Sequence, residues 1–320
     1  MANTFPTPTG RLRPPARWGD RIFHALVGAG GFALVLLAVA LIAVLWSGSE
    51  PTSSRYGVSF LWRTQPWNAE TDAYGAAPQI IGTLVTSAIA LLLAVPLSVG
   101  AAIFLTQQAP RWLRGPVAQV IELLAAVPSI VFGFWALVVL VPIMRYQIEP
   151  TLKVGLGWTG LFSSTPIGLD YLTASVVLAV MVVPTITAIS RDSIAAVPRD
   201  QREGALSLGA TTWEASSRVI VPYARSGIFG GVVLGLGRAL GETMAVTLTI
   251  GNNNYLPVSL LSQGQTLASL IANEFTEASG KSELSALIEA GLVLLVITFL
   301  VNVVARFILH RFEVSGGNRE

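Results

Sequence analysis

Six apolar windows, each long enough to cross a lipid bilayer, constrain this chain of 320 residues more than any other feature. A membrane-spanning helix needs about 20 apolar residues, because the hydrocarbon core is about 30 Å thick and a helix rises about 1.5 Å per residue. The windows predict spans at residues 22–46, 80–105, 117–144, 172–190, 228–250 and 284–307. Only 12% of the residues are charged, about half the usual share, so we expect an all-α polytopic membrane protein.

The positions of the basic residues predict the orientation of these spans, because Lys and Arg concentrate in cytoplasmic loops. With a cytoplasmic N-terminus, fourteen basic residues fall inside, namely Arg11, Arg13, Arg17, Arg21, Arg111, Arg114, Arg191, Arg199, Arg202, Arg218, Arg225, Arg306, Arg311 and Arg319. Five fall outside, namely Arg55, Arg63, Arg145, Lys153 and Lys281. We therefore expect cytoplasmic tails at residues 1–21 and 311–320, on either side of a transmembrane domain at residues 22–310.

Several kinds of chemistry are absent from the sequence. There is no cysteine, and the two histidines, His24 and His310, lie near opposite ends, so we expect no metal or other cofactor in this chain. The net charge of +2 fits a membrane topology better than nucleic-acid binding. The Gly-Lys-Ser at residues 280–282 resembles the end of a phosphate-binding loop, but Phe275 occupies the position of its first glycine. We therefore expect no ATP hydrolysis by this chain, and no loop gathers a catalytic set.

The predicted fifth span contains two charged residues, Arg238 and Glu242, in the stretch "GLGRALGETMAV". On a continuous helix, which advances about 100° per residue, they share one face with a stripe of glycines. These glycines are Gly227, Gly231 and Gly235. Small residues at this spacing let another helix approach closely, so we expect the face to meet protein or a water-filled path near the middle of the membrane.

Two interpretations of this charged pair follow. In the first, Arg238 and Glu242 pair with each other and only hold helices together. In the second, Arg238 offers its guanidinium donors to an anion that crosses the membrane, and Glu242 holds it in readiness. A charge at the bilayer centre costs about 2.5 to 3.5 kcal/mol or more, so such residues are functional candidates by default. The substrate path is therefore predicted to contain Arg238, Glu242 and Thr243.

Proline and glycine interrupt other spans, at Pro128 and Gly133 in the third and at Pro184 in the fourth. They favour either a packing kink or a helix that lines a cavity. Glu122 and Glu289 lie near span ends, where we expect them to be solvated or paired.

Two connecting loops carry distinctive residues. In the first external loop, residues 47–79, Trp62, Trp67 and Tyr74 favour either interface anchors or contact with an external partner. The cytoplasmic loop at residues 191–225 is long and patterned for short helices, with Pro198 before one and Gly209 ending it.

That cytoplasmic loop resembles the EAA signature of the permeases of ABC importers, whose pattern is E-A-A-x3-G-x9-I-x-L-P. In "EGALSLGATTWEASSRVIVP" the matches are Glu203, Ala205, Gly209 and Pro222, and the departures are Gly204, Val219 and Val221. The resemblance implies a type I ABC-importer permease fold. It also implies that a coupling helix with Arg202, Glu203, Ala205 and Gly209 docks on an ATPase subunit that binds ATP and Mg.

Two further segments narrow the resemblance. "GRALGETMAVTLTIGN" at residues 237–252 and "AAVPSIVFGFWAL" at residues 125–137 are similar to the PstC-type permeases of phosphate importers. The likeness implies a bacterial inner-membrane location and transport of phosphate by alternating access. The implied partners are a second, PstA-like permease, a PstB-like ATPase dimer, a PstS-like phosphate-binding protein outside the membrane, and membrane lipid.

Two alternatives remain beside this function. The chain could be the permease of an importer for another oxyanion, such as molybdate or sulfate. It could also be a membrane scaffold that signals phosphate status without moving phosphate.

Overall fold

A computed structural model describes the backbone of residues 18–317 and the side chains as far as residue 308. The described chain forms two units, the parts of Met1–Ser47 and Gly48–Glu320 that lie in this range, and each is treated by itself. Most of the predicted N-terminal tail and residues 318–320 of the C-terminal tail lie outside the described residues. Within residues 18–317 the structure contains helices and turns but no strand, as predicted.

The helices follow one another in thirteen α-helical segments among the described residues. They are α1 Trp18–Tyr56, α2 Ala77–Ile103, α3 Arg111–Ala125, α4 Ser129–Trp135, α5 Val141–Ile143, α6 Glu149–Leu156, α7 Tyr171–Ala195, α8 Arg199–Ser207, α9 Thr212–Ala215, α10 Val221–Leu240, α11 Met244–Thr247, α12 Leu267–Glu274 and α13 Lys281–Gly317. Single π-helical turns lie at Phe104–Gln108, Ala136–Leu140, Met144–Ile148 and Ser216–Ile220. Six helical stretches are long and apolar enough to span a membrane, which confirms the predicted number.

The first unit consists of the part of α1 up to Ser47. Its apolar side chains, such as Phe32, Leu37 and Leu41, are exposed in this chain. A helix that is apolar on all sides is suited to a lipid environment.

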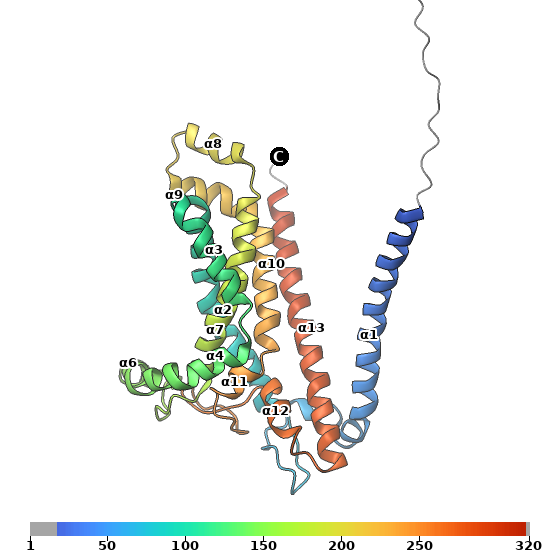
Figure 1. Ribbon diagram of the computed structural model, residues 1–320. Helices are drawn as coiled ribbons and strands as arrows, with labels where there is room; N and C mark the ends of the chain where they lie inside the picture. Colours follow the sequence, from blue (N-terminus) through green and yellow to red (C-terminus); the bar gives the residue numbers. More distant parts are fainter. Residues whose placement is uncertain (1–17, 318–320) are drawn as a thin grey trace, which may run out of the picture. The chain divides into compact units, whose positions relative to one another are not determined.

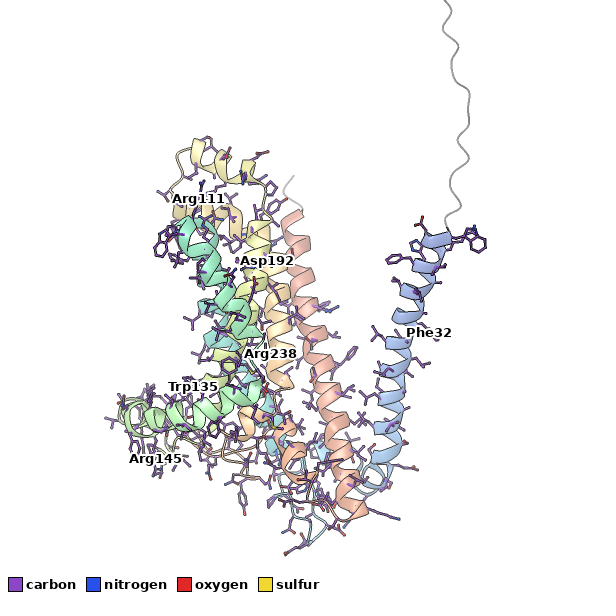
Figure 2. The ribbon with its side chains drawn as sticks, in the orientation of Figure 1. Phe32, Arg111, Trp135, Arg145, Asp192 and Arg238 are labelled. Carbon is purple, nitrogen blue, oxygen red and sulfur yellow. The ribbon has the colours of Figure 1, made fainter. Side chains whose placement is uncertain are left out.

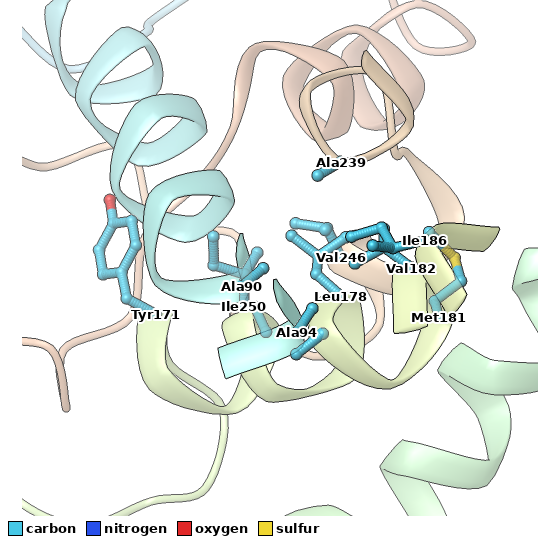
Figure 3. Close-up of a cluster of buried hydrophobic side chains, with 12 residues drawn as sticks. Ala90, Ala94, Tyr171, Leu178, Met181, Val182, Ile186, Ala239, Val246 and Ile250 are labelled. Atoms are coloured by element: carbon cyan, nitrogen blue, oxygen red, sulfur yellow. The ribbon is translucent and has the colours of Figure 1, made fainter. Parts of the chain in front are cut away.

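The second unit is a bundle built around α7. Figure 1 shows α2, α7, α10 and α13 side by side, with α8 and α9 at one end and α12 at the other. Large side chains of α7, including Leu178, Met181 and Ile186, pack against the small Ala90 and Ala94 of α2 and Ala239 of α10 (Figure 3). Small residues let helix backbones approach closely, and close packing rather than the hydrophobic effect holds membrane helices together.

The predicted third span, residues 117–144, is wrong because the chain breaks inside it. α3 ends at Ala125 and α4 begins at Ser129, with Pro128 between them in an extended conformation at φ −57° and ψ 137°. Proline has no N–H to donate and disfavours helix in the residue before it, so the helix stops there. The helical stretch that is apolar enough to span a membrane is instead Ser129–Thr159. It leads away from the bundle in Figure 1.

The predicted fifth span, residues 228–250, is also wrong at its outer end. α10 stops at Leu240, and the N–H of Gly241 closes its last turn onto the carbonyl of Gly237 at 3.3 Å. The apolar sequence continues to Ile250, but as the short helix α11 and turns. The helical wheel that placed Glu242 beside Arg238 therefore applies only as far as Leu240.

The two span-end glutamates behave differently. Glu122 pairs with Arg191, with 3.0 Å between Oε1 and the guanidinium nitrogen, as expected. Glu289 is buried in α13 at 7% exposure, and its Oε2 has no partner among the described residues. For Glu289 the expectation of solvation or pairing is wrong.

Two buried carboxyl groups lie together where α6 meets the N-terminal end of α7. Glu149 accepts hydrogen bonds from the N–H of Gly168 at 3.0 Å and from the hydroxyl of Thr173 at 3.3 Å. Asp170 caps α7 by accepting from the N–H of Thr173 at 2.8 Å. Burial raises the pKa of Asp170 to about 8, and the charge of Glu149 adds to the rise. The pair therefore fastens the α6 segment to α7 best when Asp170 is protonated.

We expect Asp170→Asn to remove a pH dependence of stability. The pKa of Asp170 is raised from 3.8 to about 8. The contribution of Asp170 to the free energy of unfolding is therefore fully present below pH 3.8 and is lost as the pH rises to about 8. The slope reaches ~1.4 kcal/mol per pH unit for one proton. Asparagine keeps the capping oxygen but carries no titrating group. The midpoint temperature of thermal unfolding, measured on the purified protein across the neutral pH range, should fall as the pH rises in the parent and fall less in the variant. Equal slopes of this temperature against pH would contradict the prediction.

Candidate functional site

Arg238 lies in the last turn of α10 and points at two other helices. Its guanidinium donates to the Thr185 hydroxyl of α7 at 3.0 Å and to the carbonyl of Ala125, the last residue of α3, at 3.4 Å. Figure 2 shows Arg111, Asp192 and Arg238 following one another down the bundle, so Arg238 lies far from the end of the bundle at which Arg111 lies. No carboxylate in the described part of the chain comes within ion-pair distance of Arg238. The guanidinium charge of Arg238 is thus partly buried, and its hydrogen-bond partners among the described residues are a neutral hydroxyl and a neutral carbonyl.

Glu242 is buried at 8% exposure and forms no ion pair with Arg238. Its Oε1 accepts from the N–H of Ala245 at 3.2 Å, in the first turn of α11. Thr243 lies beside it, and its hydroxyl donates to the carbonyl of Gly241 at 3.4 Å. Arg238 and Glu242 therefore do not pair with each other, so the first interpretation of the charged pair does not hold among the described residues.

The two sequence segments that carried the narrower resemblance meet at this site. Arg238 bonds to Ala125 across the break before α4. A Cβ added to Gly133 of α4 would lie 2.8 Å from the Cα of Ala245 in α11, so only glycine permits this approach. The break at Pro128 follows the Ala125 carbonyl that Arg238 contacts, and Gly133 permits the close approach of α4 to α11. Such an arrangement presents donors of a fixed cation to an anion without an acidic competitor.

The three glycines predicted to pack helices lie against α7. A Cβ added to Gly227 would lie 2.2 Å from Oγ of Ser193, and at Gly231 it would lie 3.1 Å from Cβ of Ile189. At Gly235 it would lie 2.7 Å from Cγ1 of Ile186. The three glycines therefore lie on the face of α10 that packs on α7, where Arg238 also contacts Thr185.

The predicted coupling residues lie on α8 and directly after it. Arg202, Glu203 and Ala205 belong to α8, which Pro198 introduces. Gly209 has φ +87° and donates its N–H to the carbonyl of Leu206 at 3.0 Å. A positive φ is readily adopted only by glycine, so Gly209 ends α8 and starts the turn to α9. Thr211 and Glu214 then close a capping box at α9.

A cavity of about 840 Å³ lies between α8, α3 and the end of α7. Five arginines line it, namely Arg111, Arg114, Arg191, Arg199 and Arg202. Glu203 is the acidic residue among them. The coupling segment therefore presents a positive surface, which sequence spacing alone did not predict.

A second cavity, of about 370 Å³, joins the loops predicted to be external. It is lined by Trp67 and Asn68 of the first loop and by residues 251–255 and Gln263 of the third. Of these residues, only Trp67 stood out in the sequence, as an interface anchor or a contact for an external partner. The run of three asparagines at residues 252–254 was the available signal, but nothing in the sequence shows that residues 66–68 meet it.

Comparison with known proteins identifies the family. Residues 94–314 match the family described as "Binding-protein-dependent transport system inner membrane component". The chain is 47% identical over 317 residues to the phosphate transport system permease protein PstC of Xylella fastidiosa, covering 98% of this chain and 97% of that one. It is 45% identical over 302 residues to the protein of the same name from Mesorhizobium japonicum, covering 93% and 92%.

Solved structures agree on the fold. A chain of a bacterial alginate ABC transporter, solved in complex with an alginate-bound periplasmic protein, superposes with a TM-score of 0.61 at 14% identity. The alignment covers 92% of this chain and 97% of that chain. A chain of the methionine ABC transporter MetNI in an inward-facing conformation gives a TM-score of 0.54 at 14% identity, covering 73% and 94%. This chain is therefore a multi-pass inner-membrane permease subunit, and it belongs to the binding-protein-dependent transport system inner membrane component family, among the PstC permeases.

Proposed function

We propose that this chain carries inorganic phosphate into the cell, as one of two permease subunits that open alternately to the two sides of the membrane. The observation that carries the proposal is Arg238, a partly buried cation held by Thr185 and Ala125 with no carboxylate in ion-pair distance among the described residues. A single arginine lowers the barrier for a phosphate anion without trapping it, because release requires breaking only one strong contact. The names of its relatives support phosphate as the anion.

The proposed complex contains a second, PstA-like permease, a PstB-like ATPase dimer that binds ATP and Mg, and an external PstS-like phosphate-binding protein. Gly209 fixes the angle between α8 and the helices that lead to Arg238, so force applied to Arg202, Glu203 and Ala205 reaches the site through α9 and α10. The arginine-lined cavity behind α8 suits an acidic surface on the ATPase.

Reconstitution tests the proposal. Proteoliposomes with this chain, the second permease and the ATPase should take up radiolabelled phosphate when ATP and the phosphate-loaded binding protein are supplied. Excess sulfate or molybdate should compete poorly. Strong competition would make another oxyanion the substrate, and an assembled complex that binds phosphate without uptake would favour a signalling scaffold.

A further inference from the structure

The cavity of about 840 Å³ behind α8 contains more positive charge than the described carboxylates neutralise. Five arginines line it, and the carboxylate among the lining residues is Glu203. One of the five, Arg191, pairs with Glu122 at 3.0 Å and with Asp192 at 2.8 Å. Five guanidinium groups against these three carboxylates leave two positive charges without a counter-charge.

The unneutralised charge lies on arginines of α3 and α8. Arg111, Arg199 and Arg202 form no ion pair and no side-chain hydrogen bond within the described part of the chain. Arg114 donates from Nε to the carbonyl of Ala109 at 2.7 Å, which leaves its two terminal nitrogens as donors. A guanidinium does not lose its proton in proteins, so the cavity attracts an anion at any physiological pH.

Acceptors are few in the same lining. Besides Glu203, the amide of Gln107 presents an oxygen that has no partner among the described residues. The hydroxyl of Thr106 donates to the carbonyl of Ala102 at 2.8 Å. One carboxylate and one amide oxygen cannot hold a cation among five arginines, because like charges repel. The sign of the charge, rather than a pattern of hydrogen bonds, therefore selects an anion.

The cavity lies at the end of the bundle that is predicted to face the cytoplasm. Leu105 and Ile194 line it, and each lies in the last turn of a stretch that is long and apolar enough to span a membrane. Figure 1 shows α3 beginning at the end of the bundle where α8 and α9 lie. Trp112, in the first turn of α3, is 75% exposed, as is typical of tryptophans at the level of lipid headgroups. Both a free anion and a lipid headgroup can reach such a position.

We propose that this cavity binds a phosphate group on the cytoplasmic side of the membrane. A phosphate group accepts two parallel hydrogen bonds from one guanidinium, and it carries about one to two negative charges near neutral pH. Its charge therefore matches the two positive charges that the described carboxylates leave. Free inorganic phosphate and the headgroup of an anionic lipid both present this chemistry at the inner surface. The inference goes beyond the proposed function and does not rest on it.

One helix connects this cavity to the candidate site. Arg111, Arg114 and Ala118 of α3 line the cavity, and Ala125, the last residue of α3, accepts a hydrogen bond from Arg238. A phosphate group in the cavity therefore contacts the helix whose other end orients Arg238. The competing occupant is an acidic side chain of the ATPase, because α8 carries the residues proposed to meet that subunit.

A single introduced cysteine reports whether the cavity is occupied, because the chain contains no cysteine. Ala118→Cys places a thiol in the lining, and Gln119→Cys places one on the next residue of α3, outside the lining. The complex of both permeases and the ATPase, free of the binding protein, is reconstituted in nanodiscs of phosphatidylcholine, whose headgroup is neutral overall. The rate of modification by N-ethylmaleimide, an uncharged reagent, is then read from the mass of this chain.

Two additions distinguish the sources of the phosphate group. In one arm inorganic phosphate is added, with potassium chloride at the same ionic strength as the control. In the other, phosphatidylglycerol replaces part of the phosphatidylcholine. At about ten times its dissociation constant, the ligand should slow modification of Ala118→Cys about tenfold and leave Gln119→Cys unchanged. Protection by inorganic phosphate identifies the free anion, and protection by phosphatidylglycerol alone identifies a lipid headgroup.

Two arginine variants show whether the protection depends on the charge of the cavity. Arg111→Gln removes one cavity charge that makes no contact with a described carboxylate, and it should weaken binding about tenfold, which corresponds to ~1.4 kcal/mol. Arg218→Gln removes an exposed arginine of the same cytoplasmic loop region that does not line the cavity. The Arg218→Gln variant should leave the protection unchanged.

The proposal is overturned if neither addition slows the modification of Ala118→Cys, if chloride slows it equally, or if the two arginine variants behave alike. It is also overturned if the Ala118→Cys thiol is unreactive in the complex without either addition but reacts once the ATPase is removed, because the ATPase then fills the cavity. None of these measurements depends on transport. Failure of phosphate uptake by the same complex would refute the proposed function and leave the cavity result in place.

Discussion

Replacement of Arg238 by glutamine is expected to lower ATP-driven phosphate uptake by about 30- to 140-fold, the factor for losing about 2 to 3 kcal/mol of charge-assisted hydrogen bonding. Glutamine is polar but two bonds shorter than the arginine side chain that reaches Thr185 at 3.0 Å, and it offers the anion no positive charge. Uptake is measured in proteoliposomes, with ATP hydrolysis recorded in the same preparation.

Two further variants separate charge from structure. Arg238→Lys keeps the charge and should retain more transport than glutamine, although it loses the planar fork. Thr185→Val removes the hydroxyl that orients Arg238 but leaves the cation, so its defect should be smaller than that of glutamine. Unchanged uptake by Arg238→Gln, in complexes with normal assembly and thermal stability, would contradict a role of this residue in the path.

Replacement of Gly209 by proline is expected to reduce transport to background. Gly209 has φ +87°, whereas proline fixes φ near −65°, and the substitution removes the N–H that bonds Leu206 at 3.0 Å. The turn between α8 and α9 cannot form, so the coupling segment loses its angle to α10. The measurements are phosphate uptake and the amount of ATPase that copurifies with the permease.

Alanine variants provide the matched controls for this turn. At Gly209, an added Cβ meets no atom within 4 Å, so Gly209→Ala bears only the strain of a positive φ, about 1 to 2 kcal/mol, and should keep part of the transport. Gly204→Ala lies in open space inside α8 and should be neutral or slightly stabilising. Full transport with normal ATPase content in Gly209→Pro would refute the assigned role.

Hydropathy predicted the number of spans because an apolar window of sufficient length is a local property of the chain. It failed at Pro128 and after Leu240, where apolar sequence continues but the helix does not. Proline and the Gly-Glu-Thr segment were visible as interruptions, yet a wheel drawn through them placed Glu242 beside Arg238. The actual partner of Glu242 is a backbone N–H three residues later.

Contacts between distant segments could not be predicted from one sequence. Arg238 meets residues 113 and 53 positions earlier in the chain, and Asn254 meets Gln79 from 175 positions away. Glycine spacing did indicate a packed face on α10, because that pattern lies within one helix. The outer cavity depends on two loops folding together, and only the tertiary structure joins Trp67 to the asparagine run.

The surroundings of Arg238 also determine how the site responds to acidity. Arg238 lies in the last turn of α10 and contacts the last carbonyl of α3, so two helix C-termini face its charge. Each C-terminus acts as about half a negative charge, and together they balance about one guanidinium. Peptide dipoles neither gain nor lose protons, unlike a carboxylate counter-ion. The pH profile of transport at this step should therefore follow the protonation of the anion itself.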